Sequence, residues 1–245
     1  MGWDVHIRRP SFLEAYNMKF FKYTLGAMIM AGGLAFALAL PAFAMPLDRR
    51  VIVVDAGHGG RDPGMVSGKV DEKDINLQIA QKLQAHLELG GATVIITRMD
   101  DSGLSKSKSG DMAARRLIAN TSHADIFVSI HQNAYGSSNV RGAQAFYFDD
   151  SNNSQKLAEA IQHQLKAFAD PSNRFKARAN TNYFVLKQTE MPAVLVECGF
   201  LTNPGEKAKL QTDAYQEKIA WAIYMGIVDY FHTKDEATPE APAAE

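Results

Sequence analysis

Cysteine is nearly absent from this sequence, since Cys198 is the single cysteine among 245 residues. One cysteine excludes an internal disulfide framework and any zinc cluster built from several thiolates, so a bound metal ion must use histidine and carboxylate ligands. Long runs of lysine and arginine are also absent, and the formal net charge is close to zero, at -1. Without a basic stripe, we expect no nucleic-acid partner.

An apolar segment near the N-terminus predicts export. Lys19 and Lys22 precede the run YTLGAMIMAGGLAFALAL, which ends in PAFA, with small residues at the spacing of a signal-peptidase site. We expect residues 1–44 to form a leader, either a cleaved signal peptide or a retained membrane anchor, that delivers the protein to the periplasm or cell envelope. The Arg8-Arg9 pair leaves the general and twin-arginine export routes both open.

Strand-like and helix-like segments alternate after the leader. The predicted strands cover residues 51–56, 92–98, 125–131, 142–148, 183–186 and 192–198, and the predicted helices cover 75–89, 111–122, 154–169 and 206–231. This alternation predicts a single doubly wound α/β domain over residues 45–232, with a mostly parallel sheet and helices on both faces. Residues 233–245 are rich in proline, alanine and acidic residues, which predicts a disordered tail.

Polar side chains lie where three of the predicted strands end. His58 follows the first strand within the glycine-rich turn AGHGG, His131 ends the third strand, and Glu197 lies at the end of the last. Sites in open α/β sheets form outside the carboxyl ends of the strands, so we expect these side chains at one edge of the sheet. Taken singly, each histidine is also explained by a tight turn or a polar strand end.

A catalytic zinc site needs a third protein ligand, and two histidines with one glutamate are a recurring set. Glu72 is the candidate, because it lies in the first turn of the helical segment that follows the His58 turn. The alternative is a purely structural role for Glu72, since acidic residues are favoured in the first turn of a helix and Asp71 with Asp74 resembles a capping pair. On spacing alone, both interpretations stay open.

Four segments together resemble the zinc-dependent N-acetylmuramoyl-L-alanine amidases of bacterial cell walls, the amidase_3 family. These segments are DAGHGGRDPG, EKDINL, ANTSHADIFVSIHQNA and MPAVLVECGFLTNPGE, and the likeness covers essentially the whole domain after the leader. The resemblance implies a Zn²⁺ ion held by His58, Glu72 and His131, with Glu197 as general base on a zinc-bound water. It also implies hydrolysis of the amide bond between N-acetylmuramic acid and L-alanine in peptidoglycan.

Metal-assisted amide hydrolysis also suits these residue types on chemical grounds. A cation polarises the carbonyl and lowers the pKa of water, and a carboxylate outside the metal shell takes up and returns a proton. Two other functions stay open: a zinc peptidase acting on the stem peptides of peptidoglycan, and a non-catalytic wall-binding or regulatory domain. We expect a peptidoglycan substrate and no obligatory protein activator, because the chain after His131 has no room for a blocking helical insertion.

Several other residues are expected to have structural roles. Arg115 is expected to pair with a carboxylate, and Asp55 either orients a site group or fixes the glycine turn. Cys198 neighbours Glu197 in a strand, so its side chain should point to the opposite face and pack as a small buried hydrophobe. Four more histidines are expected to be surface or packing residues: His86, His123, His163 and His232.

Overall fold

The computed structural model describes residues 45–149 and 151–237, so the predicted leader lies outside the described residues. The strands are β1 (Val51–Ala56), β2 (Val66–Ser67), β3 (Val70–Asp71), β4 (Thr93–Ile96), β5 (Ile126–Asn133), β6 (Gln144–Tyr147), β7 (Arg178–Ala179) and β8 (Ala193–Phe200). The helices are α2 (Glu72–Leu89), α3 (Lys108–Thr121), α4 (Asn152–Gln164), the π-helical turn η1 (Leu165–Ala169), α5 (Phe184–Gln188), α6 (Pro204–Leu210) and α7 (Asp213–Ala237). Within these residues, no helix combines the length and hydropathy needed to cross a membrane.

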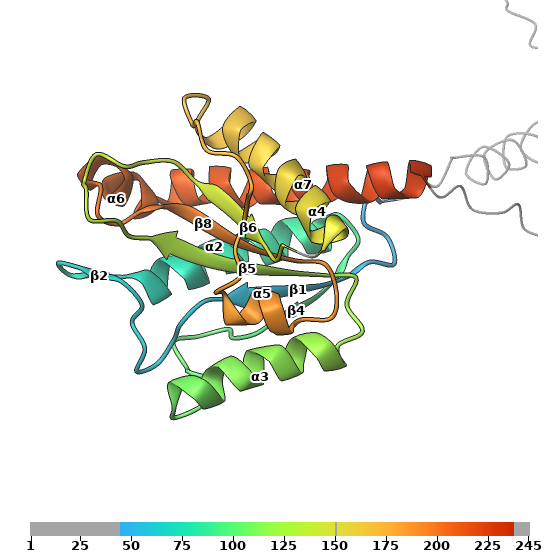
Figure 1. The fold of residues 1–245 in the computed structure, drawn as a ribbon, viewed down its shortest axis with the longest axis horizontal. Coiled ribbons are helices and arrows are strands. Elements are labelled where there is room, and N and C mark those ends of the chain that lie inside the picture. The colour runs from blue at the N-terminus through green and yellow to red at the C-terminus, as the bar shows by residue number, and fades with distance from the viewer. Residues whose placement is uncertain (1–44, 150, 238–245) are drawn as a thin grey trace, which may run out of the picture. The chain divides into compact units, whose positions relative to one another are not determined.

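Six strands form a mixed, mostly parallel sheet in the order β4-β1-β5-β8-β6-β7 (Figure 1). β1 pairs in parallel with β4 and β5, and β5 pairs in parallel with β8. β6 then runs antiparallel to β8, and β7 follows β6 in parallel. The predicted α/β fold with a mostly parallel sheet is confirmed, whereas the reversal at β6 and β7 has no signature in the alternating sequence pattern.

Helices cover both faces of this sheet (Figure 1). On one face, α2, α4 and α7 enclose a larger core that includes Val128 and Val196. On the other face, α3 and α5 pack on a smaller core that includes Phe127 and Leu195. Neighbouring residues alternate between the two cores because successive side chains in a strand point to opposite faces. Burial on both faces explains why the strands read as continuous apolar runs rather than as alternating patterns.

The segment YFVL, predicted as a strand over residues 183–186, leads instead into helix α5. The side chain of Asn180 accepts a hydrogen bond from the backbone N–H of Tyr183, at 3.2 Å, and this turn directs the chain into a helix. Val185 and Leu186 are buried in the smaller core. A short apolar run suits one turn of buried helix as well as a strand, and the prediction was wrong for this reason.

The long C-terminal segment predicted as one helix divides into α6 and α7. The hydroxyl of Thr212 accepts a hydrogen bond from the backbone N–H of Tyr215, at 3.3 Å, and so caps the first turn of α7. α7 then continues to Ala237, into the segment predicted as a disordered tail. Residues 238–245 lie outside the described residues.

The parallel strands β1, β5 and β8 bring their carboxyl ends to one edge of the sheet. His131 on β5 and Glu197 on β8 are register partners there. Residues an even number of positions apart in a strand share a face, and His131 shares a face with Phe127 as Glu197 does with Leu195. Both side chains therefore lie on the face covered by α3 and α5. Cys198 is buried in the larger core on the opposite face, as predicted.

Candidate metal centre

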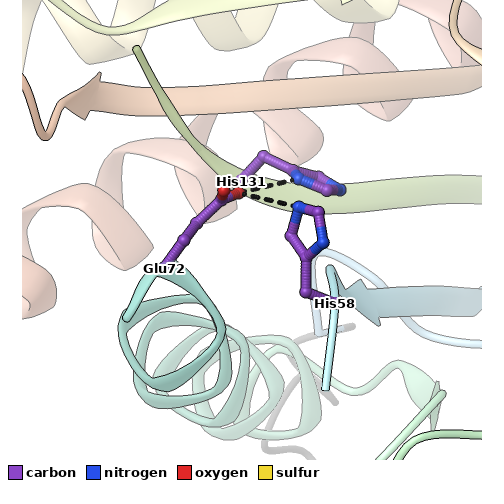
Figure 2. Close-up of side chains that lie close together, drawn as sticks. All are labelled: His58, Glu72 and His131. Carbon is purple, nitrogen blue, oxygen red and sulfur yellow. Dashed lines mark hydrogen bonds and ion pairs between the residues drawn. The ribbon is translucent and has the colours of Figure 1, made fainter. Parts of the chain in front are cut away.

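Two histidines and one glutamate from separate elements meet at this edge of the sheet (Figure 2). His58 comes from the turn after β1, Glu72 is the first residue of α2, and His131 lies on β5. One potential ligand atom of each residue lies within 4.8 Å of those of the other two. Glu72 Oε1 is 3.0 Å from His131 Nδ1 and 3.3 Å from His58 Nε2. The three residues predicted as metal ligands therefore lie together.

Glycine is required at two positions for this approach. A Cβ atom at Gly57 would lie 2.3 Å from the imidazole ring of His131, a distance that side chains do not tolerate. A Cβ atom at Gly64 would lie 2.5 Å from Glu72 Oε2, and the φ of this glycine is +67°. Backbone without a side chain is thus needed at both ends of the turn that carries His58.

Two buried arginines hold the backbone of that turn. Arg115 on α3 donates to the carbonyl oxygens of Ala56 and His58, at 2.7 and 2.6 Å. Arg98, just after β4, donates to the carbonyl oxygens of Ala56 and Gly57, at 2.9 and 3.0 Å. His58 has a φ of +61°, which is unfavourable for a residue other than glycine. The four charge-assisted hydrogen bonds stabilise the turn against this strain.

Asp55 balances the charge of Arg115 beneath the turn. Its carboxylate accepts hydrogen bonds from Arg115 at 2.5 Å, Thr97 at 2.8 Å and Ser129 at 2.6 Å. Burial by itself would raise the pKa of Asp55, but the Arg115 charge and the hydrogen bonds outweigh burial and lower it. The predicted pairing of Arg115 with a carboxylate is confirmed, and Asp55 acts on the glycine turn through that arginine.

The carboxylate of Glu72 is oriented from several directions. Its Oε2 accepts from the backbone N–H of Met65 at 2.8 Å, and its Oε1 accepts from the backbone N–H of Gln132 at 3.1 Å. Asn76, one turn along α2, donates its side-chain amide to Oε1 at 3.2 Å. Hydrogen bonds from surrounding groups are the means by which proteins fix metal ligands in place.

The surroundings of Glu72 differ from those expected of a helix-capping pair. Asp71 precedes α2, but its side chain makes no capping hydrogen bond. Burial by itself would raise the pKa of Glu72, but the hydrogen bonds with His131 and His58 outweigh burial and lower it. The Glu72 side chain is therefore an ionised carboxylate directed at two imidazoles. Asp62 adds an outer carboxylate, with its Oδ2 2.9 Å from His58 Nδ1.

Glu197 lies beside this group, in a cavity of about 280 Å³ that His58, Glu72 and His131 also line. Tyr183, the residue before α5, donates its hydroxyl to Glu197 Oε1 at 3.1 Å. The other carboxylate oxygen, Oε2, is buried and has no hydrogen-bond partner among the described residues. Burial raises the pKa of Glu197. A buried carboxylate oxygen without a partner is costly, so Glu197 is not simply one half of a structural ion pair.

The residues present fit a zinc ion. Two imidazoles and one carboxylate form a donor set of catalytic zinc sites that keep a coordination position for water or substrate. Asp62 behind His58 supplies the outer carboxylate that commonly orients such a histidine. Glu197 also lines the cavity and supplies a carboxylate outside the group of three potential ligands.

Three contacts of this site were missed by sequence reasoning. Asp62 lies four residues after His58, and its place in the same turn was an available signal. Arg98 ends a strand-like segment at the same sheet edge, but an arginine at the end of a strand does not indicate hydrogen bonds to backbone carbonyl oxygens. Tyr183 belongs to the segment mistaken for a strand, so its contact with Glu197 had no signal in the sequence.

Comparison with known proteins identifies the family of this chain. The model of the N-acetylmuramoyl-L-alanine amidase family matches residues 52–229. The chain belongs to this family. It is 37% identical over 202 residues to the germination-specific N-acetylmuramoyl-L-alanine amidase of Bacillus subtilis. The aligned region covers 79% of this chain and 85% of that relative. It is 35% identical over 188 residues to the B. subtilis amidase LytC, covering 76% of this chain and 36% of LytC.

Solved amidases share the fold. The CwlD amidase of Clostridioides difficile, solved in complex with the GerS lipoprotein, is 42% identical with a TM-score of 0.73, covering 75% of this chain and 99% of that one. An N-acetylmuramoyl-L-alanine amidase of Clostridium difficile 630 is 34% identical with a TM-score of 0.69, covering 76% and 98%. The resemblance carried by the four motifs is confirmed, and the protein is an amidase, a hydrolase that acts on an amide bond.

Proposed function

We propose that this amidase cleaves the bond between N-acetylmuramic acid and L-alanine with a zinc ion held by His58, Glu72 and His131. Glu197 is the general base in this proposal. The observation that supports it most strongly is the convergence of two imidazoles and an ionised carboxylate on a cavity that a second carboxylate, that of Glu197, also lines. That combination suits amide hydrolysis, where both the carbonyl and the attacking water need activation.

Each group in the cavity has a defined task. Zinc, when bound, polarises the scissile carbonyl and lowers the pKa of a water molecule. Glu197 takes the proton of the attacking water on its carboxylate and returns it to the leaving amine of L-alanine. Its pKa, raised by burial, brings proton uptake and release closer to neutral pH. Tyr183 donates a hydrogen bond to Oε1 and holds this carboxylate in place.

Apolar side chains complete the cavity. Met112, Val185 and Leu195 line it together with the charged groups. An apolar wall limits the number of water molecules around the carboxylates and strengthens the electrostatic interactions within the site. The scissile amide would thus react in a less polar environment than bulk water.

Peptidoglycan is the substrate that the family indicates, and relatives named as cell wall amidases place such enzymes at the wall. We infer that this protein acts in the cell envelope. We also expect activity without an added protein, because the described residues between β5 and α4 form β6 and loops and contain no blocking helix. The CwlD amidase was solved in complex with a lipoprotein. If this protein cleaved its substrate only when such a lipoprotein was added, the expectation would be wrong.

The test is digestion of purified peptidoglycan by the full-length protein, with the products read by mass spectrometry. An amidase releases intact stem peptides with a free L-alanine amine and leaves the glycan strands uncut. The matched control is Glu197→Gln, which keeps the zinc ligands and removes the base. We expect this variant to retain zinc while kcat falls by about 10²- to 10⁴-fold, the usual contribution of a general base. Cleavage within the stems would identify a zinc peptidase instead.

A further inference from the structure

Of three grooves that border the cavity of the proposed zinc site, two have mostly polar linings drawn from several segments of the chain. The first has a volume of about 620 Å³ and shares Tyr183 with the cavity. The second has a volume of about 270 Å³ and shares Asp62, Lys108 and Asp111 with it. A muramoyl-L-alanine substrate extends from the scissile amide in two directions, as a saccharide and as a peptide. Each groove therefore borders the cavity where one arm of the substrate would leave.

The first groove, which we call the aromatic groove, is lined mostly by neutral side chains. Its charged lining residue is Arg178, and the others are aromatic rings, amides and small residues. It lies close to Glu197, because Gln144 of its lining is the register partner of that residue. Five aromatic residues line it: Tyr135, Phe146, Phe175, Tyr183 and Phe200.

These side chains suit a saccharide. The carbonyl oxygen of the Gln144 side chain and the amide nitrogen of the Asn133 side chain make no hydrogen bond within the described residues, so an acceptor and a donor are both available. Tyr135 is 62% exposed and presents its ring at the rim. Sugar rings pack their C–H faces on aromatic rings and pair their hydroxyl and acetamido groups with amides. The aromatic groove offers both kinds of contact.

The second groove, which we call the basic groove, has a different charge. Arg61, Lys106 and Lys108 line it, and within the described residues no carboxylate lies within 4.0 Å of any of the three cations. Its two aspartates are already engaged: Asp62 with His58, and Asp111 with Arg115. The lining thus carries three cations against two aspartates, and its exposed Arg61 and Lys106 leave an excess of positive charge that favours an anionic ligand.

We propose that the glycan arm of the substrate lies in the aromatic groove and the stem peptide lies in the basic groove. The carboxyl group of muramic acid is consumed in the scissile amide, so N-acetylated saccharides are neutral, whereas the stem peptide carries free carboxylates. The charges of the two grooves match this difference. This inference rests on the proposed amidase function, because it assigns the two arms of that reaction's substrate.

Kinetics with four soluble substrates test the assignment in the full-length enzyme. Two substrates carry N-acetylglucosaminyl-N-acetylmuramic acid on a tripeptide, one with free stem carboxylates and one with those carboxylates amidated. The other two carry N-acetylmuramic acid alone on the same peptides. The variants are the double substitution Arg61→Gln, Lys106→Gln for the basic groove and Tyr135→Ala for the aromatic groove. Matched controls are Arg116→Gln, Lys156→Gln and Phe168→Ala, at exposed residues that line neither groove.

We expect the wild type to prefer the free-acid stems in KM by about fivefold, as two exposed charge pairs would provide. The Arg61/Lys106 double variant should lose this preference and keep the preference for the disaccharide. Tyr135→Ala should lose the disaccharide preference and keep the preference for free-acid stems. Lys106→Glu should favour the amidated stems. The control variants should behave like the wild type.

Two results would overturn the assignment. If the effects are exchanged, so that Tyr135→Ala alters the charge preference, the arms lie the other way round. If neither variant alters either preference, the grooves do not hold the substrate. Calorimetric binding of the released tripeptide to the full-length protein separates these failures from failure of the proposed function. In one outcome, no substrate is cleaved, but the wild type binds the tripeptide and the Arg61/Lys106 double variant binds it more weakly; the amidase proposal then fails and the peptide site stands. In the other outcome, the double variant binds the tripeptide as well as the wild type does, and the peptide site fails.

Discussion

Helix α2 carries a histidine–carboxylate cluster near each of its ends. At its start, Glu72 meets His58 and His131 at 3.3 and 3.0 Å. Near its end, His86 meets Glu217 of α7 at an even shorter distance, 2.6 Å. The second cluster also borders the larger cavity, about 740 Å³ against about 280 Å³. Pair distance and cavity size would therefore select the wrong end of the helix as the functional site.

Burial and convergence distinguish the two ends. The Glu72 side chain is 5% exposed, whereas that of Glu217 is 48% exposed. His58, Glu72 and His131 come from three elements, and among the described residues they are the group whose ligand atoms have the spacing for a metal. The His86 cluster joins two helices and supplies no third ligand. A metal site thus requires buried ligands fixed by surrounding hydrogen bonds, and a surface ion pair does not supply them.

His131→Ala has the largest expected effect at either end of α2. Removing one of three ligands should reduce zinc from about one ion per chain to near zero and reduce hydrolysis by at least about 10³-fold, since both the carbonyl and the water lose activation. Metal content by inductively coupled plasma mass spectrometry, together with turnover of muropeptides, measures both. Zinc retained at one ion per chain in this variant would refute the ligand assignment.

Arg115→Met tests whether the support of the His58 turn is as strong as its hydrogen bonds indicate. The change leaves Asp55 buried without its cation and removes two bonds to the turn, so the free energy of unfolding should fall by about 3–5 kcal/mol. Urea unfolding followed by circular dichroism measures the loss. Arg116→Met, at the exposed neighbouring position on α3, should change it by less than about 0.5 kcal/mol. Equal effects of the two substitutions would contradict the account.

Tyr183→Phe has a smaller expected effect on the same site. The loss of one hydrogen bond to the Glu197 carboxylate should lower kcat by roughly tenfold, with zinc content unchanged. The hydrogen bond from Tyr183 lowers the pKa of Glu197, so its removal raises that pKa. Because the base must be deprotonated, the acidic limb of the kcat profile should move to higher pH. A shift to lower pH, or no shift, would show that Tyr183 does not act on Glu197.

His86→Ala has the smallest expected effect. Its pairing with Glu217 lies near the surface, where such pairs contribute about 0.2–1 kcal/mol to stability. Zinc content and turnover should equal those of the wild type, as measured in the same assays used for His131→Ala. A loss of zinc in this variant would mean that the groove between α2 and α7 binds metal, and the proposed difference between the two ends of α2 would be wrong.

Much of the fold followed from the sequence because its physical signals are local. Continuous apolar runs predicted the strands β1, β5 and β8, and periodicity predicted α2 and α3. The rule that parallel strands end at one sheet edge then predicted that His58, His131 and Glu197 would be neighbours. The antiparallel direction of β6 depends on long-range pairing, and no short segment encodes it.

The surroundings of the site were less accessible to sequence reasoning. The left-handed φ of His58 is imposed by Arg98 and Arg115, which lie about 40 and 57 residues further along the chain. Tyr183 reaches Glu197 because an Asn180 turn starts α5, and a short apolar run does not distinguish that turn from a strand. The proximity of the proposed ligands was therefore predictable from motif and topology, whereas the groups that orient them depend on tertiary contacts.

In the proposed metal centre, one zinc ion is held by His58, Glu72 and His131. X-ray absorption at the zinc edge of the purified full-length protein tests it most directly, with the metal-to-protein ratio measured on the same sample. We predict one zinc per chain, with nitrogen and oxygen neighbours at about 2.0–2.2 Å, two of them imidazoles, and no sulfur. Sulfur scattering from Cys198, or an unchanged spectrum in the double variant His58→Ala, His131→Ala, would contradict the account.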